Sequence, residues 1–141
     1  MNREEFIKAY HDFIDTALGA AAKARREGLL ALDGDIDREK AGQRDIFHYG
    51  LQFAVDGASP EIIDKIISNI AAQEKDEYAR LLKIIQKEAV MGIQQGYNPN
   101  ILHCVLNSYT DLPVVDEEAR FGIDEDEKQY EHDEGKYDGE T

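Results

Sequence analysis

The sequence predicts an all-α protein, and three observations support this. Apolar residues recur at spacings of three and four along most of the chain, which is the pattern of amphipathic helices. Ser59-Pro60 and Asn98-Pro99 have the cap-then-proline order that opens helices. With 141 residues, of which 42% are hydrophobic, the chain can bury a core. We expect a compact domain of about four helices over residues 1–112 and an acidic tail over 113–141.

The first predicted element is one long helix over residues 3–32. Its apolar stripe consists of Phe6, Tyr10, Phe13, Ala17, Ala21 and Ala24. Gly28 falls inside this helix and weakens it by roughly 1 kcal/mol relative to alanine. Asp33-Gly34-Asp35 ends the helix, and a polar loop follows as far as Arg44.

A shorter helix is predicted from Asp45 to Val55, with Asp56-Gly57-Ala58 as its stop signal. Its inward residues are Phe47, Leu51 and either Ala54 or Val55. The next helix begins at Pro60, and we expect its isoleucines to form one buried face. These are Ile62, Ile63, Ile66, Ile67 and Ile70.

The apolar pattern is interrupted at residues 73–77 and then resumes as far as Ile93. A single bent helix from Pro60 to Gln95 and two separate helices both fit this pattern. The chain therefore either folds back here as a tight hairpin or runs straight and pairs with another copy. A last helix is predicted from Asn98-Pro99 to about Tyr109, and Pro113 ends the ordered body.

The formal net charge is -14, which argues against nucleic acid and anionic lipid as partners. The longest stretch without formal charge is polar in its middle, so we expect no membrane insertion and a cytoplasmic location. The residues from Asp111 to Thr141 include 13 acidic and 3 basic residues, a net of -10. This tail is too poor in apolar residues to fold alone, and we expect it to be disordered. It is either a solubilising extension or, with Tyr130 and Tyr137 among its acids, a motif for a basic partner.

One acidic run begins like a calcium-binding loop. Asp33, Asp35 and Asp37 alternate as such a loop requires. However, Arg38 stands at the sixth position, where the loop needs glycine, and Arg44 stands at the twelfth, where it needs glutamate. The sequence therefore disfavours a calcium site.

The remaining candidates for chemistry are weak. The four histidines, His11, His48, His103 and His132, show no metal-ligand spacing. We expect His103 at the surface and Cys104 as a small buried hydrophobic residue. There is no glycine-rich phosphate loop, nucleophile elbow, HExxH or CxxC. We therefore predict that the protein is not an enzyme and has no catalytic residue, no metal and no cofactor.

Three stretches of the chain, ARREGLLALD (24–33), GLQFAVDGASPE (50–61) and EAVMGIQQGYNP (88–99), together resemble the flagellar stator protein MotA family. Residues 24–33 are ARREGLLALD, similar to the segment after the second membrane helix of the family. Residues 50–61 are GLQFAVDGASPE, similar to a segment of the same cytoplasmic loop. Residues 88–99 are EAVMGIQQGYNP, similar to the segment that follows the fourth membrane helix. The order matches that of the family, and the resemblance covers roughly residues 5–110.

The membrane helices of the family have no counterpart here. In MotA a membrane hairpin separates the second and third stretches, whereas this chain has only residues 74–87 at that place. We favour a natural soluble paralogue, with an engineered joining of two cytoplasmic segments as the alternative. Ion conduction needs helices that span the membrane, so the resemblance implies a role without ion conduction. It leaves the protein contacts of the cytoplasmic loop, which in the family meets the rotor protein FliG.

The resemblance also implies which residues make this contact. The contact arginine of the family falls on Arg25, and its contact glutamate falls on Asp33, one methylene shorter, with Arg26 adjacent. In a continuous helix Arg25 and Asp33 share one face about 12 Å apart along the axis. The residues alone indicate only a solvated helix end, where basic side chains lie near the negative end of the dipole.

Three functions are therefore weighed. The leading hypothesis is an accessory component of the flagellar motor that binds FliG or MotA/MotB stator units and modulates torque or stator number. The alternative is a MotA-derived scaffold or interaction module unrelated to motility. A small-molecule-binding or catalytic helical protein is the third, and a deep, enclosed polar pocket would favour it. Assembly into a homo-oligomer stays open, since stator subunits form rings.

Overall fold

The computed structural model describes residues 1–39 and 45–113, which are all-α and contain no strand. The elements are α1 (Arg3–Glu27), the 3-10 helix η1 (Leu29–Asp35), α2 (Ile46–Val55), α3 (Pro60–Ala72), α4 (Glu77–Gln94) and α5 (Pro99–Asn107). The predicted all-α class is confirmed, with five α-helices in place of about four. No helix among these residues has the length and apolar character that crossing a membrane requires.

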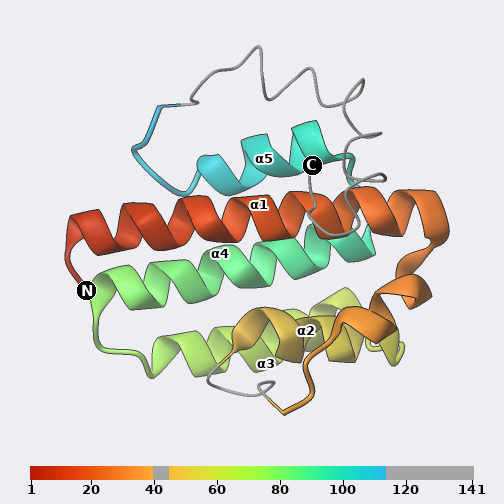
Figure 1. Ribbon diagram of the computed structural model, residues 1–141. Helices are drawn as coiled ribbons and strands as arrows, with labels where there is room; N and C mark the ends of the chain where they lie inside the picture. The colour runs from red at the N-terminus through yellow and green to blue at the C-terminus, as the bar shows by residue number, and fades with distance from the viewer. Residues whose placement is uncertain (40–44, 114–141) are drawn as a thin grey trace.

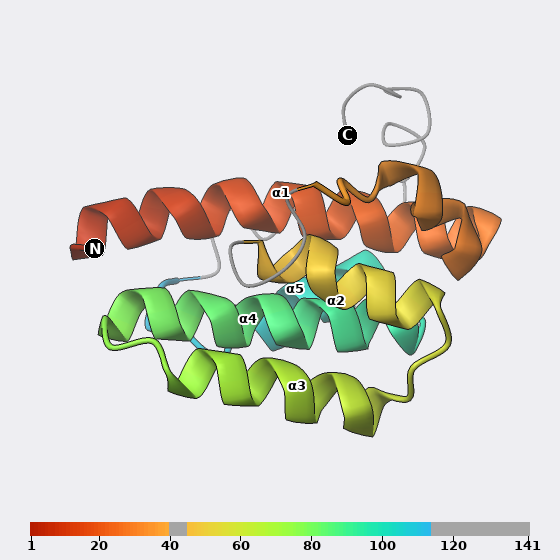
Figure 2. The ribbon, with the colours of Figure 1, turned by 90° about the horizontal axis from the view of Figure 1, so that it is seen from below.

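The central element is α4, which packs against α1, α2, α3 and α5. Figure 1 shows α1 and α4 side by side, with α5 on one flank and the α2–α3 pair on the other. Seen from below in Figure 2, α3 and α4 form an antiparallel hairpin. The inner side chains of α4, among them Ile85, Ala89 and Val90, are 0% exposed. The core therefore forms around the inner face of α4.

The long first helix is shorter than predicted, because α1 ends at Glu27. Gly28 has φ 96° and ψ 157°, a conformation that residues with a Cβ adopt only at a cost. The chain then turns into η1, which folds back so that the Lys23 Nζ lies 2.9 Å from the Asp35 Oδ2. Leu32, 0% exposed, holds η1 against the core. The predicted continuous helix over 3–32 is thus wrong, and Gly28 is a helix stop rather than a weak interior position.

This conformation predicts unequal effects for two neighbouring glycines. Gly28→Ala should lower the free energy of unfolding by about 1–3 kcal/mol, because a Cβ is strained at this φ. Gly34→Ala is the matched control, since no heavy atom lies within 4 Å of its added Cβ and its φ is ordinary. It should be neutral or stabilise by up to about 1 kcal/mol. Urea denaturation measures both, and equal effects would contradict the assigned helix end.

The predicted helix starts at α2, α3 and α5 are confirmed. Each is capped by the side chain before it: Asp45 accepts from the His48 N–H at 3.2 Å, Ser59 from the Ile62 N–H at 3.3 Å, and Asn98 from the Ile101 N–H at 2.8 Å. Between α3 and α4 the chain folds back as a hairpin, where Asp76 caps α4 through the Ala79 N–H at 2.8 Å. Of the two alternatives for residues 60–95, the pair of helices is correct.

The isoleucine face of α3 is narrower than predicted. Ile63 and Ile67 are 0% exposed, and Ile66 and Ile70 are partly buried, but Ile62 is 47% exposed. At about 100° per residue these five positions span an arc of about 140°, and Ile62 lies at the edge of the arc away from the buried Ile63 and Ile67. In α2 the inward set is confirmed: Phe47, Leu51 and Ala54 are buried.

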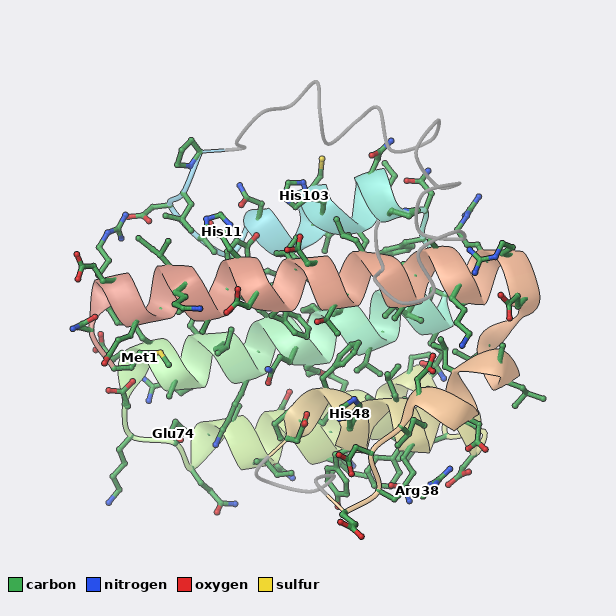
Figure 3. All side chains as sticks on the ribbon, viewed as in Figure 1. Met1, His11, Arg38, His48, Glu74 and His103 are labelled. Carbon is green, nitrogen blue, oxygen red and sulfur yellow. The ribbon has the colours of Figure 1, made fainter. Side chains whose placement is uncertain are left out.

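The assignment of His103 and Cys104 is reversed in the structure. His103 is 5% exposed, whereas Cys104 is exposed. The buried face of α5 is set by Leu102 and Leu106, both 0% exposed, and His103 lies beside them on the same face. Figure 3 shows His103 on α5, above α1. Position on the helix outweighed residue type, which is why the sequence interpretation was wrong.

Candidate functional site

The three MotA-like stretches, which are far apart in the sequence, meet at one end of the bundle. The Arg25 Nη1 donates to the Gly96 carbonyl at 2.7 Å, which joins the first stretch to the third. The Gln94 Nε2 donates to the Ala58 carbonyl at 2.7 Å, which joins the third stretch to the second. α1, α2 and α4 all finish at this end, on the right of Figure 1.

The turns at this end share one feature. Gly28, Gly57 and Gly96 have φ of 96°, 94° and 83°, and they are the glycines with positive φ in the described part of the chain. We call this region, formed by residues 24–36, 55–60 and 94–101, the glycine-turn end. The opposite end holds the start of α1 and the α3–α4 turn, where the Met1 ammonium lies 3.0 Å from the Asp76 Oδ1.

Two further glycines of the resembling stretches have packing roles. A Cβ on Gly50 would lie 2.8 Å from the Val90 Cγ2, and a Cβ on Gly92 would lie 2.7 Å from the Leu102 Cδ1. These glycines let α2 and α5 approach α4 closely. The glycines of the three stretches thus serve the fold, which leaves the exposed charges as the candidates for function.

The three predicted contact residues lie at the glycine-turn end. Arg25 and Arg26 are exposed on the last turn of α1, and Asp33 is exposed on η1. The Arg26 Nη2 is 2.9 Å from the Glu27 Oε2, and Asp33 is ion-paired with Arg38. Because α1 ends at Glu27, the predicted shared helix face is wrong. The folding back of η1 nevertheless brings all three residues to the same end.

The carboxylates of the calcium-like run do not converge. Asp33 pairs with Arg38, Asp35 pairs with Lys23 at 2.9 Å, and the Asp37 Oδ1 accepts from the Glu39 N–H at 3.1 Å. Within residues 1–39 and 45–113, no three His, Cys, Asp or Glu side chains are placed to hold a metal ion. Arg44, at the twelfth position of this run, lies outside the described residues.

Sequence reasoning missed one residue of the glycine-turn end. Leu30 is 71% exposed, more than Ile101 at 50%, which also lies at this end, or Ile62 at 47%. The sequence analysis placed Leu30 within the predicted helix over residues 3–32 and assigned it no role. The signal that could have found it is the threefold repeat of a 3-10 helix, in which positions 29 and 32 share a face that excludes 30.

A partly buried polar cluster joins α3 to α4 away from the glycine-turn end. The Lys87 Nζ, on a side chain 11% exposed, lies 2.6 Å from the Asp64 Oδ1, 3.0 Å from the Ser68 Oγ and 3.5 Å from the Glu88 Oε2. Burial lowers the pKa of Lys87, but the hydrogen bond and charge of Asp64 outweigh it and the pKa is raised. The hydrogen bond from Lys87 lowers the pKa of Asp64. Asp64 and Ser68 lie on α3 and Lys87 lies on α4, so these contacts tie the two helices together.

A small-molecule-binding or catalytic role finds no support in the hollow beside the α3–α4 turn. It has a volume of about 400 Å³ and is lined by Ile70, Gln73, Glu74, Lys75 and Lys83. Figure 3 labels Glu74 beside this turn, at the end of the bundle opposite the glycine-turn end. The Glu74 Oε1 is 3.0 Å from the Lys83 Nζ. The hollow is open and polar, whereas small-molecule sites are enclosed and mostly apolar.

Residues 1–39 and 45–113 define an all-α helical bundle with five α-helices, and its candidate site is the exposed, charged surface of the glycine-turn end rather than a pocket. A scan against models of protein families, a search of curated proteins and a search of solved structures give no match to this chain. The resemblance to MotA therefore has only the three sequence stretches behind it.

Proposed function

We propose that the protein is an accessory protein-binding component of the flagellar motor. Its glycine-turn end would contact the rotor protein FliG or MotA/MotB stator units in the cytoplasm. One observation carries the proposal: the MotA-like stretches meet in space, joined by the Arg25–Gly96 and Gln94–Ala58 hydrogen bonds. Because the three stretches form one surface together, a partner could contact all of them at once.

The charges at this end suit a contact that sets orientation and association rate. The Gly96 carbonyl occupies one N–H of Arg25, and a guanidinium has five, so others stay available to a partner carboxylate. Arg26 and Asp33 are exposed beside it. Exposed charges of this kind add little affinity but steer encounter and reject wrong partners. The proposed role is contact with proteins and excludes ion conduction.

A titration tests the proposal. Purified protein is mixed with FliG and, separately, with stator units, and binding is followed by calorimetry at two salt concentrations. We expect saturable binding to one of them, weaker at high salt because the charges are screened. Arg26→Glu should weaken binding about tenfold, equivalent to about 1.4 kcal/mol. Lys75→Glu is the control, since Lys75 is exposed at the opposite end. No binding to either partner at high micromolar concentration would exclude the proposal.

The alternative is a scaffold that keeps the same surface for a partner outside motility. The exposed charges of this end suit any protein of complementary charge and are not specific to a rotor protein. Genomic context discriminates the two: a gene beside motility genes supports the motor role, and a genome without flagella supports the scaffold.

A further inference from the structure

The outer face of α5 carries no charge. The longest run of the sequence without Asp, Glu, Lys or Arg covers residues 89–110 and includes the whole of this helix. Leu102 and Leu106, both 0% exposed, point into the bundle. The opposite face is formed by residues that recur every three or four positions. These are Ile101, which is 50% exposed, Cys104 and Ser108, which are exposed, and Val105, which is partly exposed.

This face lies on the outside of the bundle. α5 packs against α1 and α4, and Figure 1 shows no other helix of the described residues beyond it. The outer faces of α1 and α3 differ, since they expose charged residues such as Asp12, Asp15 and Lys65. Covering the α5 face therefore removes apolar surface from water without removing a charge of that face from water, which would be costly.

The charge of the chain indicates which molecule this face suits. At a formal net charge of -14, two copies of the chain repel each other, whereas a basic protein is attracted to the acidic surfaces rather than to a neutral one. An uncharged face is where two copies approach with the least repulsion. In a two-fold interface a residue near the axis also meets its own copy, so a charge there would face an equal charge. The α5 face meets this requirement.

We propose that the outer face of α5 is a dimer interface, in which α5 of one copy packs antiparallel against α5 of a second copy. The midpoint of the face that runs from Ile101 to Ser108 lies between positions 104 and 105. Cys104 and Val105 therefore lie nearest the two-fold axis, and Ile101 of each copy lies near Ser108 of the other.

Charge also selects the antiparallel orientation. Residues 111–141, which follow α5 in the sequence, carry a net charge of -10. Antiparallel pairing places the two copies of Asp111 at opposite ends of the helix pair, whereas parallel pairing would place them side by side. It also sets opposite ends of the two helix dipoles next to each other.

The size of the face indicates a weak dimer. A helix of nine residues is only about 14 Å long, so α5 offers less than the roughly 800 Å² per partner of a standard stable interface. Interfaces below that size are typical of transient complexes. We therefore expect a dimer that forms at high micromolar concentration. It goes beyond the proposed function and does not depend on it, because it needs no other protein.

Sedimentation equilibrium of the full chain in reducing buffer tests the association. We expect a monomer–dimer equilibrium that becomes tighter as salt is raised, because salt screens the repulsion between the copies. Cys104→Lys and Cys104→Glu should each weaken the dimer at least about tenfold, because either charge meets its own copy near the axis. Cys104 is exposed, so both variants should keep the wild-type unfolding midpoint.

The matched controls place the same charges elsewhere. Asn69 is exposed on α3, on the flank opposite α5 in Figure 1. Asn69→Lys and Asn69→Glu change the net charge as the Cys104 variants do, but far from the proposed axis. They should change the dissociation constant by less than about threefold, because distant exposed charges are screened.

The single cysteine of the sequence gives a second measurement on the unaltered chain. Because Cys104 is the one cysteine present, a bis-maleimide with a short spacer joins two copies only through this residue. We expect the wild-type chain to form a covalent dimer at high micromolar concentration. The control moves the cysteine to α3 by combining Cys104→Ser with Asn69→Cys, and it should give much less covalent dimer.

The outcomes decide the inference in either direction. Weaker association in both Cys104 charge variants, unchanged association in both Asn69 variants and a covalent dimer through Cys104 support it. A chain that stays monomeric at high micromolar concentration overturns it, since something other than a second copy then covers α5. Association that Cys104→Lys strengthens and Cys104→Glu weakens also overturns it, because opposite charges then hold the copies together. Equal covalent dimer from positions 104 and 69 overturns it as well.

Discussion

Tyr10→Ala should lower the free energy of unfolding by about 3–5 kcal/mol, which is much of the stability of an ordinary domain. The Tyr10 side chain is 0% exposed in the middle of α1, and its ring stacks on Phe6 with a centroid distance of 6.0 Å. Truncation removes these contacts and leaves a cavity that rigid neighbours cannot fill. Urea denaturation followed by circular dichroism measures the loss.

The hydroxyl of Tyr10 can be tested apart from its ring. It donates to the Asn107 Oδ1 at 2.9 Å, a buried bond that ties α1 to α5. Tyr10→Phe leaves that acceptor without this donor and should cost about 1–3 kcal/mol. Cys104→Ser on the exposed side of α5 is the control and should stay within about 0.5 kcal/mol of wild type. A Tyr10→Phe variant as stable as wild type would contradict the α1–α5 contact.

Lys87→Met should have the second large effect, about 1.5–3 kcal/mol at neutral pH. Methionine fills the space of the stem but removes the ammonium that binds Asp64 at 2.6 Å and Ser68 at 3.0 Å. The Asp64 side chain is 50% exposed, which moderates the loss because water can replace part of the interaction. Urea denaturation of both proteins at pH 7 measures the difference.

The stability gap between wild type and Lys87→Met should depend on pH. The pKa of Asp64 is lowered below its ordinary 3.8, so its contribution is present above that value and is lost as pH falls through the folded pKa. The pKa of Lys87 is raised above its ordinary 10.5, so its contribution is present below that value and is lost as pH rises through the folded pKa. The gap should be widest between these limits.

The control for the Lys87 variant is Lys8→Met. The Lys8 Nζ lies 2.9 Å from the Asp12 Oδ2, a comparable distance, but the Lys8 side chain is 79% exposed. Exposed pairs at this helical spacing contribute about 0.3–0.5 kcal/mol. Losses of the same size at Lys87 and Lys8 would show that burial does not strengthen the α3–α4 cluster.

Local chemistry predicted much of the fold from the sequence. Ser59-Pro60 and Asn98-Pro99 begin α3 and α5, since a capping side chain and a proline at the first helical position need only neighbouring residues. The inward residues of α2 also followed from spacing alone. Elements whose ends are set by the local chain were predicted correctly.

Features set by tertiary packing were not predictable in this way. Gly28 was treated as a weak interior position, because spacing does not report a positive φ. The burial of His103 depends on how α5 rotates against the rest of the bundle, which residue type does not determine. The Lys87 cluster needs α3 and α4 side by side, and the sequence left that pairing open.

The candidate site was found only in part. The resemblance located Arg25, Arg26 and Asp33, but their meeting at one end depends on the reversal at Gly28. Leu30 stood out only once η1 was seen to turn it away from the core. The predicted acidic tail stays a prediction, because residues 114–141 lie outside the described part of the chain.

The proposed function depends most on whether the glycine-turn end is the surface that meets a motor protein. Titrating isotope-labelled protein with FliG, and separately with stator units, while recording amide chemical shifts tests this directly. We expect that, with one of these partners, shifts concentrate at residues 24–36 and 94–101. Shifts concentrated at residues 73–80 of the opposite end, or no shifts with either partner at high micromolar concentration, would contradict it.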